Sequence, residues 1–202
     1  MNGFLETLKT QRWDDHRYYH HSLVNQSLHL FSATSFVGAY VLLFWDPAMA
    51  ALIAWMLSMT SRQIGHFFFE PKGYDAVNQA THEYKESIKV GYNLKRKGVL
   101  LALWALSPLV LYFEPTVFGV IIPWDNVGGF FHNLGVFWLF IGISGLIFRS
   151  VQLFFLQDVQ AGLVWAVKIV TDPFHDIKLY YKAPYHLLRG DIDDGIALDH
   201  RS

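Results

Sequence analysis

The residues of this chain with the clearest chemistry are its ten histidines, several of which stand near amides at helical spacing. The segment YHHSLVNQSLH, residues 19–29, begins with the adjacent pair His20 and His21. His21, Asn25 and His29 recur every four residues and so fall on one face of a predicted helix. Because imidazole nitrogens bind iron, copper and zinc, His20, His21 and His29 are candidate metal ligands.

A second polar stripe follows in RQIGHFFFE, residues 62–70. Gln63, His66 and Glu70 are three and four residues apart, which again places them on one helical face. Amides and carboxylates at such positions complete a metal's coordination shell or orient a histidine through its second ring nitrogen. His66 is therefore a fourth candidate ligand, and Gln63 and Glu70 are candidates for supporting groups.

His82 is a fifth candidate ligand. Asn78 and Glu86 stand four residues on either side of it and resemble a supporting shell. His175 and His186 could add a ligand if the C-terminal region formed a lid over the site.

Composition limits what the chain can do. Of its 202 residues, 52% are hydrophobic and only 16% are charged, whereas soluble proteins carry about 25% charged residues. The lack of cysteine excludes a disulfide framework, a thiolate zinc site and a cysteine nucleophile. A net charge of −1 supplies no positive field for nucleic acid. Any metal must therefore be held by nitrogen and oxygen ligands.

Four apolar blocks approach the roughly 17 to 25 residues that a membrane-spanning helix requires. They cover residues 28–45, 47–69, 99–113 and 130–148. Only Asp46 and Pro47 separate the first two, which predicts a helical hairpin. Glu114 and Pro115 interrupt the third, and a break is expected there because proline has no backbone donor. We predict a single all-α domain, residues 1–202: a polytopic integral membrane protein with about four transmembrane helices.

Basic residues predict the orientation of these helices. Lys and Arg precede the first block, follow the fourth and lie between the second and third, but the stretch 114–129 has none. By the positive-inside rule, segments 1–27, 71–97 and 157–202 are expected to be cytoplasmic. The hairpin then brings His29 and His66 to the same membrane edge, which predicts a cytoplasmic histidine-rich face.

Three expectations concern the surroundings of this face. Arg62 is expected to extend toward lipid phosphate groups. Residues 171–186 are expected to form an amphipathic helix on the bilayer, capped by Thr171 or Asp172 with Pro173 at its first position. The acidic tail, residues 191–202, is expected to be a solvated end.

Over roughly residues 14–75 the chain resembles the membrane-bound 2-hydroxy-fatty-acid dioxygenase family. That family has a histidine pair before a span, an Asn and a His at fixed distances after the pair, and a later Gly-His with an acidic residue four positions on. The matching residues are His20, His21, Asn25, His29, Gly65, His66 and Glu70, with Gln63 also in keeping.

The resemblance implies a non-haem iron(II) enzyme that uses O₂ to shorten a 2-hydroxy fatty acid by one carbon. It assigns iron ligation to His20, His21, His29 and His66. It assigns ligand orientation or substrate positioning, the supporting catalytic roles, to Asn25, Gln63 and Glu70. The implied partner is a membrane lipid or fatty-acid substrate.

Two alternatives are open from the sequence alone. One is a b-type haem protein, in which two facing histidines hold the haem between helices. The other is a non-enzymatic membrane subunit whose aromatic faces contact pigment, lipid or membrane protein partners.

Overall fold

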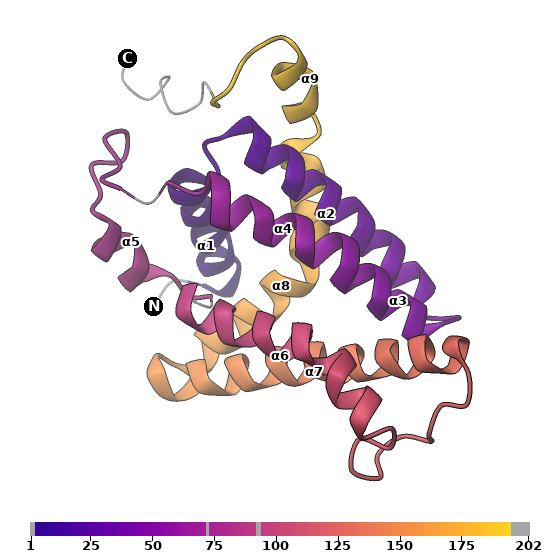
Figure 1. Cartoon of the computed structure of the whole chain (residues 1–202). Coiled ribbons are helices and arrows are strands. Elements are labelled where there is room, and N and C mark those ends of the chain that lie inside the picture. The colour runs from indigo at the N-terminus through magenta and orange to yellow at the C-terminus, as the bar shows by residue number, and fades with distance from the viewer. Residues whose placement is uncertain (1–2, 72, 92–93, 195–202) are drawn as a thin grey trace.

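The computed structural model describes residues 3–71, 73–91 and 94–194, and the regular elements within these ranges are all helices (Figure 1). In chain order they are α1 (Phe4–Tyr19), α2 (Leu23–Leu42), α3 (Pro47–Ile53), η1 (Ala54–Met59), α4 (Thr60–Ile64), η2 (Gly65–Phe69), α5 (His82–Ile88), α6 (Leu94–Phe113), α7 (Val127–Leu156), α8 (Val159–Tyr180) and α9 (Ala183–Leu188). The prediction of an all-α fold is confirmed.

The predicted helical hairpin is present. α3, η1, α4 and η2 follow one another without a gap and form one helix over residues 47–69, the predicted block. It begins at Asp46, whose Oδ1 accepts a hydrogen bond from the Met49 amide at 3.0 Å, with Pro47 at the first position. η1 and η2 are π-helical, a wider winding that is often found at functional sites. Figure 1 shows this helix beside α2 along most of its length.

α6 and α7 cross the hairpin near its Asp46 turn. α6 ends at Phe113, so the break predicted at Glu114 and Pro115 is confirmed. α3 and α7 pack closely because Gly135 has no side chain, and a Cβ there would lie 2.3 Å from the Ala48 carbonyl oxygen. An aromatic core fills the junction, where Trp104 stacks on Trp55 at 5.9 Å.

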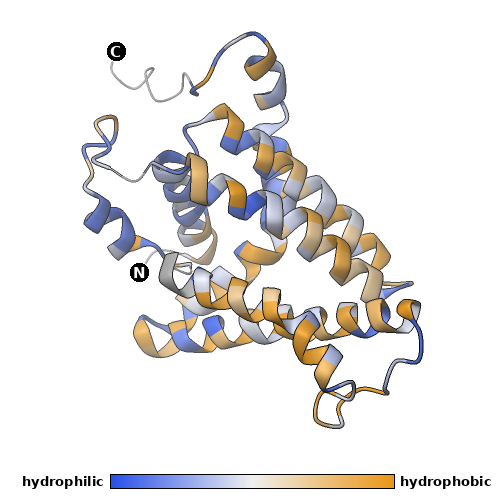
Figure 2. Ribbon diagram, in the orientation of Figure 1, coloured by the Kyte–Doolittle hydropathy of each residue, from blue (hydrophilic) through white to orange (hydrophobic). Residues whose placement is uncertain are grey.

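Apolar side chains cover the outside of α7. Ile147, Phe148 and Phe155 are all exposed, and Figure 2 shows α6 and α7 as mainly hydrophobic. Among the described helices, α7 is the one that is long and apolar enough to cross a membrane by length and composition, and Lys97–Phe113 is a shorter apolar helix.

The predicted helix start at Thr171 or Asp172, with Pro173 at its first position, is wrong. α8 begins much earlier, where Asp158 Oδ1 accepts a hydrogen bond from the Ala161 amide at 2.7 Å, and it continues through Pro173 to Tyr180. Asp172 lies inside α8 and is therefore not a cap, and its carboxylate binds Arg12 at 3.0 Å. α8 packs one face on α2 and α7 and buries Tyr180 there, while Val170 and Phe174 on its other side are exposed.

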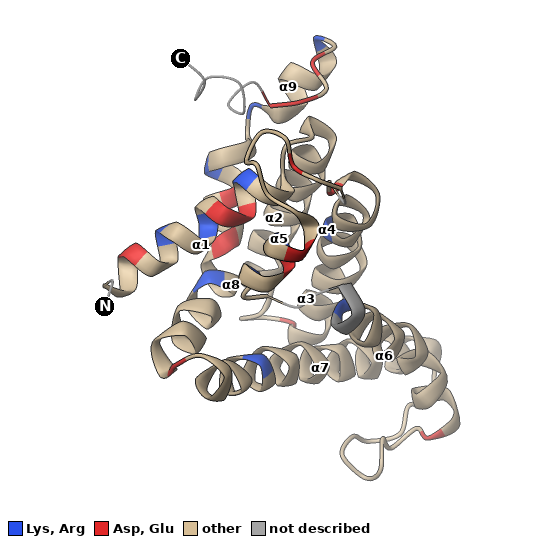
Figure 3. Ribbon diagram, turned by 90° about the vertical axis from the view of Figure 1, so that its left-hand side faces the viewer, with Lys and Arg blue, Asp and Glu red and all other residues tan. Residues whose placement is uncertain are grey.

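Charged residues concentrate on the α1 side of the molecule, whereas α7 carries only one, Arg149 (Figure 3). Between α1 and α8 they form a partly buried network. Lys168 lies 2.5 Å from both Asp15 and Asp172, and Arg12 also donates to Thr171. The network joins α1 to α8 next to the histidines.

The first residues of the predicted solvated tail, 191–193, are exposed, but the backbone of this segment is hydrogen-bonded to the chain entering α2. The Leu23 amide donates to the Ile192 carbonyl at 2.9 Å, and the Asp194 amide donates to the His21 carbonyl at 2.8 Å. We call residues 192–194 the C-terminal strap. It is held there because the chain entering α2 offers unpaired backbone groups beside it. Residues 195–202 lie outside the described part of the chain.

Candidate metal centre

The structure brings His20, His29 and His66 together. One ring nitrogen from each lies within 4.8 Å of the others. The ring centroids are 4.1 Å apart for His20 and His29 and 4.9 Å apart for His29 and His66. His29 is fully buried, His20 is buried and His66 is partly exposed. The three ligands come from the turn before α2, from α2 itself and from η2.

Gly65 permits this close approach of η2 and α2. A Cβ at Gly65 would lie 2.2 Å from Asn25 Oδ1 and 3.5 Å from His29 Cδ2. Asn25 in turn donates from Nδ2 to the Tyr19 carbonyl at 2.9 Å and so fixes the turn that carries His20. Glycine is therefore required before His66 because a larger residue would keep η2 from packing against α2, and this packing places His66 against His29.

His66 is oriented by a carboxylate. Its Nδ1 lies 2.8 Å from Glu70 Oε2, and Lys89 Nζ contacts Glu70 Oε1 at 2.9 Å. Lys89 also lies over the Tyr19 ring, 3.8 Å from its centroid. With Nδ1 bonded to Glu70, the Nε2 of His66 is available to a metal.

His29 faces a second carboxylate. Its Nδ1 lies 3.8 Å from Asp176 Oδ2, an electrostatic contact that is too long for a hydrogen bond. Asp176 forms an ion pair with Arg62. The expectation that Arg62 extends toward lipid phosphate is therefore wrong. Arg62 pairs with Asp176 inside the protein, because this buried carboxylate lies next to it.

His20 is oriented by a tyrosine. Its Nδ1 lies 2.9 Å from the Tyr180 hydroxyl, which also lies 3.3 Å from His16 Nδ1. Burial lowers the pKa of His20 well below its ordinary value, and burial raises the pKa of Tyr180 well above its own. Both groups are therefore neutral near pH 7.

The remaining nitrogens suit a metal ion. The Nε2 atoms of His20 and His29 are buried and have no hydrogen-bond partner among the described residues, and buried polar atoms in native proteins seldom lack a protein, water or ion partner. The carboxylates of Glu70 and Asp176 are each paired with a cation. Three neutral imidazoles would thus hold a divalent ion without cancelling its charge and leave coordination positions open.

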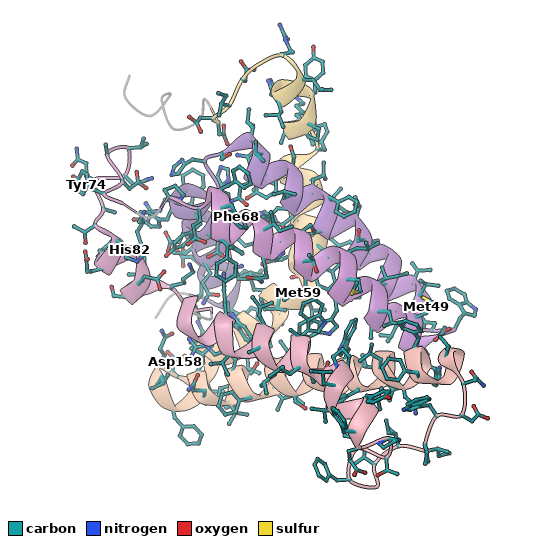
Figure 4. The ribbon with its side chains drawn as sticks, viewed as in Figure 1. Met49, Met59, Phe68, Tyr74, His82 and Asp158 are labelled. Atoms are coloured by element: carbon teal, nitrogen blue, oxygen red, sulfur yellow. The ribbon has the colours of Figure 1, made fainter. Side chains whose placement is uncertain are left out.

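His21 and His82 lie outside this cluster. α2 begins only at Leu23, so His21 precedes the helix and does not share a face with Asn25 and His29. Its Nε2 instead lies 3.5 Å from Asp75 Oδ2. His82 is exposed at the start of α5, and Figure 4 places it at the edge of the molecule.

The two predicted supporting amides are both buried. Asn25 is fully enclosed, and its Oδ1 has no hydrogen-bond partner in the described ranges. Gln63 Oε1 is likewise buried and unpartnered there. Both oxygens are thus available as acceptors, and Asn25 Oδ1 lies beside Gly65, the residue that precedes His66.

A small polar cavity adjoins His20 on the side of α1 and α8. Its volume of about 20 Å³ has room for about one water molecule. His175 helps to line the cavity but does not join the metal cluster, and His186 contacts Asp191 at 3.3 Å instead. The other charged lining residues are Arg12, Asp15, Arg62, Lys168, Asp172 and Asp176.

Sequence reasoning missed the partners that α8 supplies. Lys168, Asp172, Asp176 and Tyr180 recur every four residues, the same signal that identified the first histidine stripe. The predicted start of a helix near residue 171 divided this stripe and concealed it. Lys89 carries no such spacing signal.

Comparison with known proteins gives no match: no protein-family model, curated protein or solved structure is significantly similar to this chain. The resemblance to the dioxygenase family therefore rests on the two histidine motifs alone.

Proposed function

We propose that this protein is a membrane-bound, iron-dependent oxygenase that shortens a 2-hydroxy fatty acid by one carbon. The observation that carries the proposal is the convergence of His20, His29 and His66, each with a polar group at or near Nδ1. Histidine-rich, open coordination is suited to iron(II) that reacts with O₂.

The proposed location is a cell membrane crossed about four times, with both termini in the cytoplasm. Two features support it. Each predicted apolar block coincides with a helix or with one continuous run of helical segments. The segment between α6 and α7, at the end away from the histidines, contains no Lys or Arg. The histidine cluster would then lie where the hairpin meets the cytoplasmic surface.

The charge balance of the site favours an anionic, chelating substrate. Bound iron(II) would act as a Lewis acid and template for O₂ and substrate. A 2-hydroxy acid supplies a hydroxyl and a carboxylate to such a site. The reaction balances as RCH(OH)COO⁻ + O₂ → RCOO⁻ + CO₂ + H₂O, so O₂ is the sole oxidant and no external electron donor is consumed. Asn25 Oδ1 and Gln63 Oε1 are free to accept hydrogen bonds from the substrate or water.

A haem centre is a weaker proposal. The rings of His20 and His29 lie only 4.1 Å apart, which leaves no slot for a porphyrin between them.

The test is to purify the full chain from membranes after expression with added iron and to measure bound metal. His29→Ala and His66→Ala should each abolish iron binding, and the wild-type protein should convert a long-chain 2-hydroxy acid to the acid one carbon shorter only when O₂ is present. Wild-type protein without iron, full metal content in both variants, or no shortened acid would overturn the proposal.

A further inference from the structure

A chain of polar contacts runs from the metal cluster to the C-terminal strap. The Tyr180 hydroxyl lies between His20 Nδ1, at 2.9 Å, and His16 Nδ1, at 3.3 Å. On its other side, His16 Nε2 lies 3.6 Å from Asp194 Oδ2. His16, His20 and Tyr180 are all buried, so water does not compete for these contacts.

The proposed metal ligation determines which group donates and which accepts in each of these polar contacts. A neutral imidazole has one N–H donor and one acceptor nitrogen. If Nε2 of His20 binds a metal, its Nδ1 carries the hydrogen and donates to Tyr180. The Tyr180 hydroxyl then donates to His16 Nδ1. The remaining hydrogen of His16 is on Nε2, where it faces the carboxylate of Asp194.

A second link ties the strap to the same ligand. Gln26 Nε2 donates both to the His20 carbonyl and to Asp194 Oδ2, each at 2.8 Å. The Asp194 amide also donates to the His21 carbonyl at 2.8 Å. Both the side chain and the backbone of Asp194 are therefore hydrogen-bonded to the short turn that holds His20, the side chain through Gln26.

We infer that His16, Tyr180 and Asp194 are positioning residues of the metal centre, and that the C-terminal strap completes the site by fixing the orientation of His20. This inference rests on the proposed metal site and extends it to a segment far away in the sequence. By linkage, a metal that binds better when the strap is docked must also stabilise the docked strap.

The experiment measures binding of Zn²⁺ and Co²⁺ to the full-length protein in detergent, without any assay of turnover. Tyr180→Phe should weaken metal affinity by about 10- to 100-fold, as is usual when a ligand's hydrogen-bond partner is lost. Asp194→Asn should weaken it by roughly 10-fold at most, since Asp194 acts through His16. Asp193→Asn is the matched control, because it removes the same charge one residue away and leaves the contacts of Asp194 in place.

A double variant distinguishes a relay from general destabilisation. Tyr180→Phe removes the hydroxyl that links His16 to His20. In that background Asp194→Asn should reduce metal affinity little further, so the two effects should not add. The visible spectrum of bound Co²⁺ should also change in Tyr180→Phe and remain unchanged in Asp193→Asn. Additive losses, or equal affinities for Asp193→Asn and Asp194→Asn, would overturn the inference.

The reverse coupling gives a second readout that uses the unmutated protein. Hydrogen exchange at the Leu23 and Asp194 amides, which pair with the strap and the His21 carbonyl, should slow when Zn²⁺ is added. Exchange unchanged by bound Zn²⁺ would overturn the coupling alone. Wild-type protein that binds no metal would instead overturn the proposed metal centre, so the two failures are distinguishable.

Discussion

His20 and His21 are neighbours in the chain but lie in different environments. His20 is buried, its Nδ1 contacts Tyr180 and its Nε2 has no partner among the described residues. His21 faces Asp75 and Asn78 in the loop that follows η2. A histidine is a candidate ligand here when one ring nitrogen is engaged by a partner and the other is enclosed without one. Residue type and spacing alone do not provide that distinction.

The same contrast separates His66 from His82. Both have a carboxylate four residues later, Glu70 and Glu86 respectively. Only the first pair meets, with Nδ1 2.8 Å from Oε2. Glu86 instead contacts Lys89 at 3.3 Å, while His82 is exposed. Helical spacing brings two side chains to one face, but the packing of η2 against α2 decides which face meets the other ligands.

Removing a central ligand should give the largest effect. His29→Ala leaves two ligands and should weaken metal binding by more than the roughly 10- to 100-fold typical of losing an outer hydrogen-bond partner. His21→Ala should leave affinity nearly unchanged. Titration of both variants with Zn²⁺ checks the comparison, and equal losses would mean that His21 is also a ligand.

Gly65→Ala should disturb the site through packing. The added Cβ would meet Asn25 Oδ1, and Asn25 is buried and anchored to the Tyr19 carbonyl. The helices must separate or Asn25 must turn, at a cost of about 1–3 kcal/mol, and metal affinity should fall with His66 displaced.

Gly38→Ala is the control for this change. A Cβ at Gly38 would meet nothing within 4 Å, so alanine in α2 should stabilise the protein by about 0.5–1 kcal/mol. Thermal unfolding in detergent should therefore show shifts of opposite sign. A stabilised Gly65→Ala variant with full metal affinity would contradict the close-approach argument.

Changes around His66 should have smaller effects than loss of His29. Glu70→Gln keeps an acceptor but removes the charge that orients the ring, and it should weaken metal binding by about 10-fold. Lys89→Gln should have a weaker effect, because Lys89 acts through Glu70. Lys89→Arg retains the cation and should restore most of the affinity. Zn²⁺ titration of the three variants tests this order, and unchanged affinity in Glu70→Gln would contradict it.

The sequence predicts the hairpin and the end of α6 better than it predicts where α2 and α8 begin. Apolar length and the Asp46–Pro47 cap determine the hairpin locally, and Pro115 determines the end of α6. The sequence predicts all three clustered ligands, but it also places His21 on the face of Asn25 and His29, because the predicted helix begins before Leu23. The contributions of Asp176 and Tyr180 depend on α8 packing across α2, a contact between distant segments that periodicity within either helix does not reveal.

The pH dependence of stability gives the finest test of the contrast between buried and peripheral histidines. Burial lowers the pKa of both His16 and His20. The folded protein therefore keeps them neutral, while the unfolded chain takes up protons below about pH 6.5. Stability of the metal-free protein should fall as the pH drops below that value, by at most about 1.4 kcal/mol per pH unit for each histidine. His20→Gln should make this dependence shallower, as measured by thermal unfolding midpoints between pH 7 and 5. An identical pH dependence in the variant would show that His20 is not held neutral by burial.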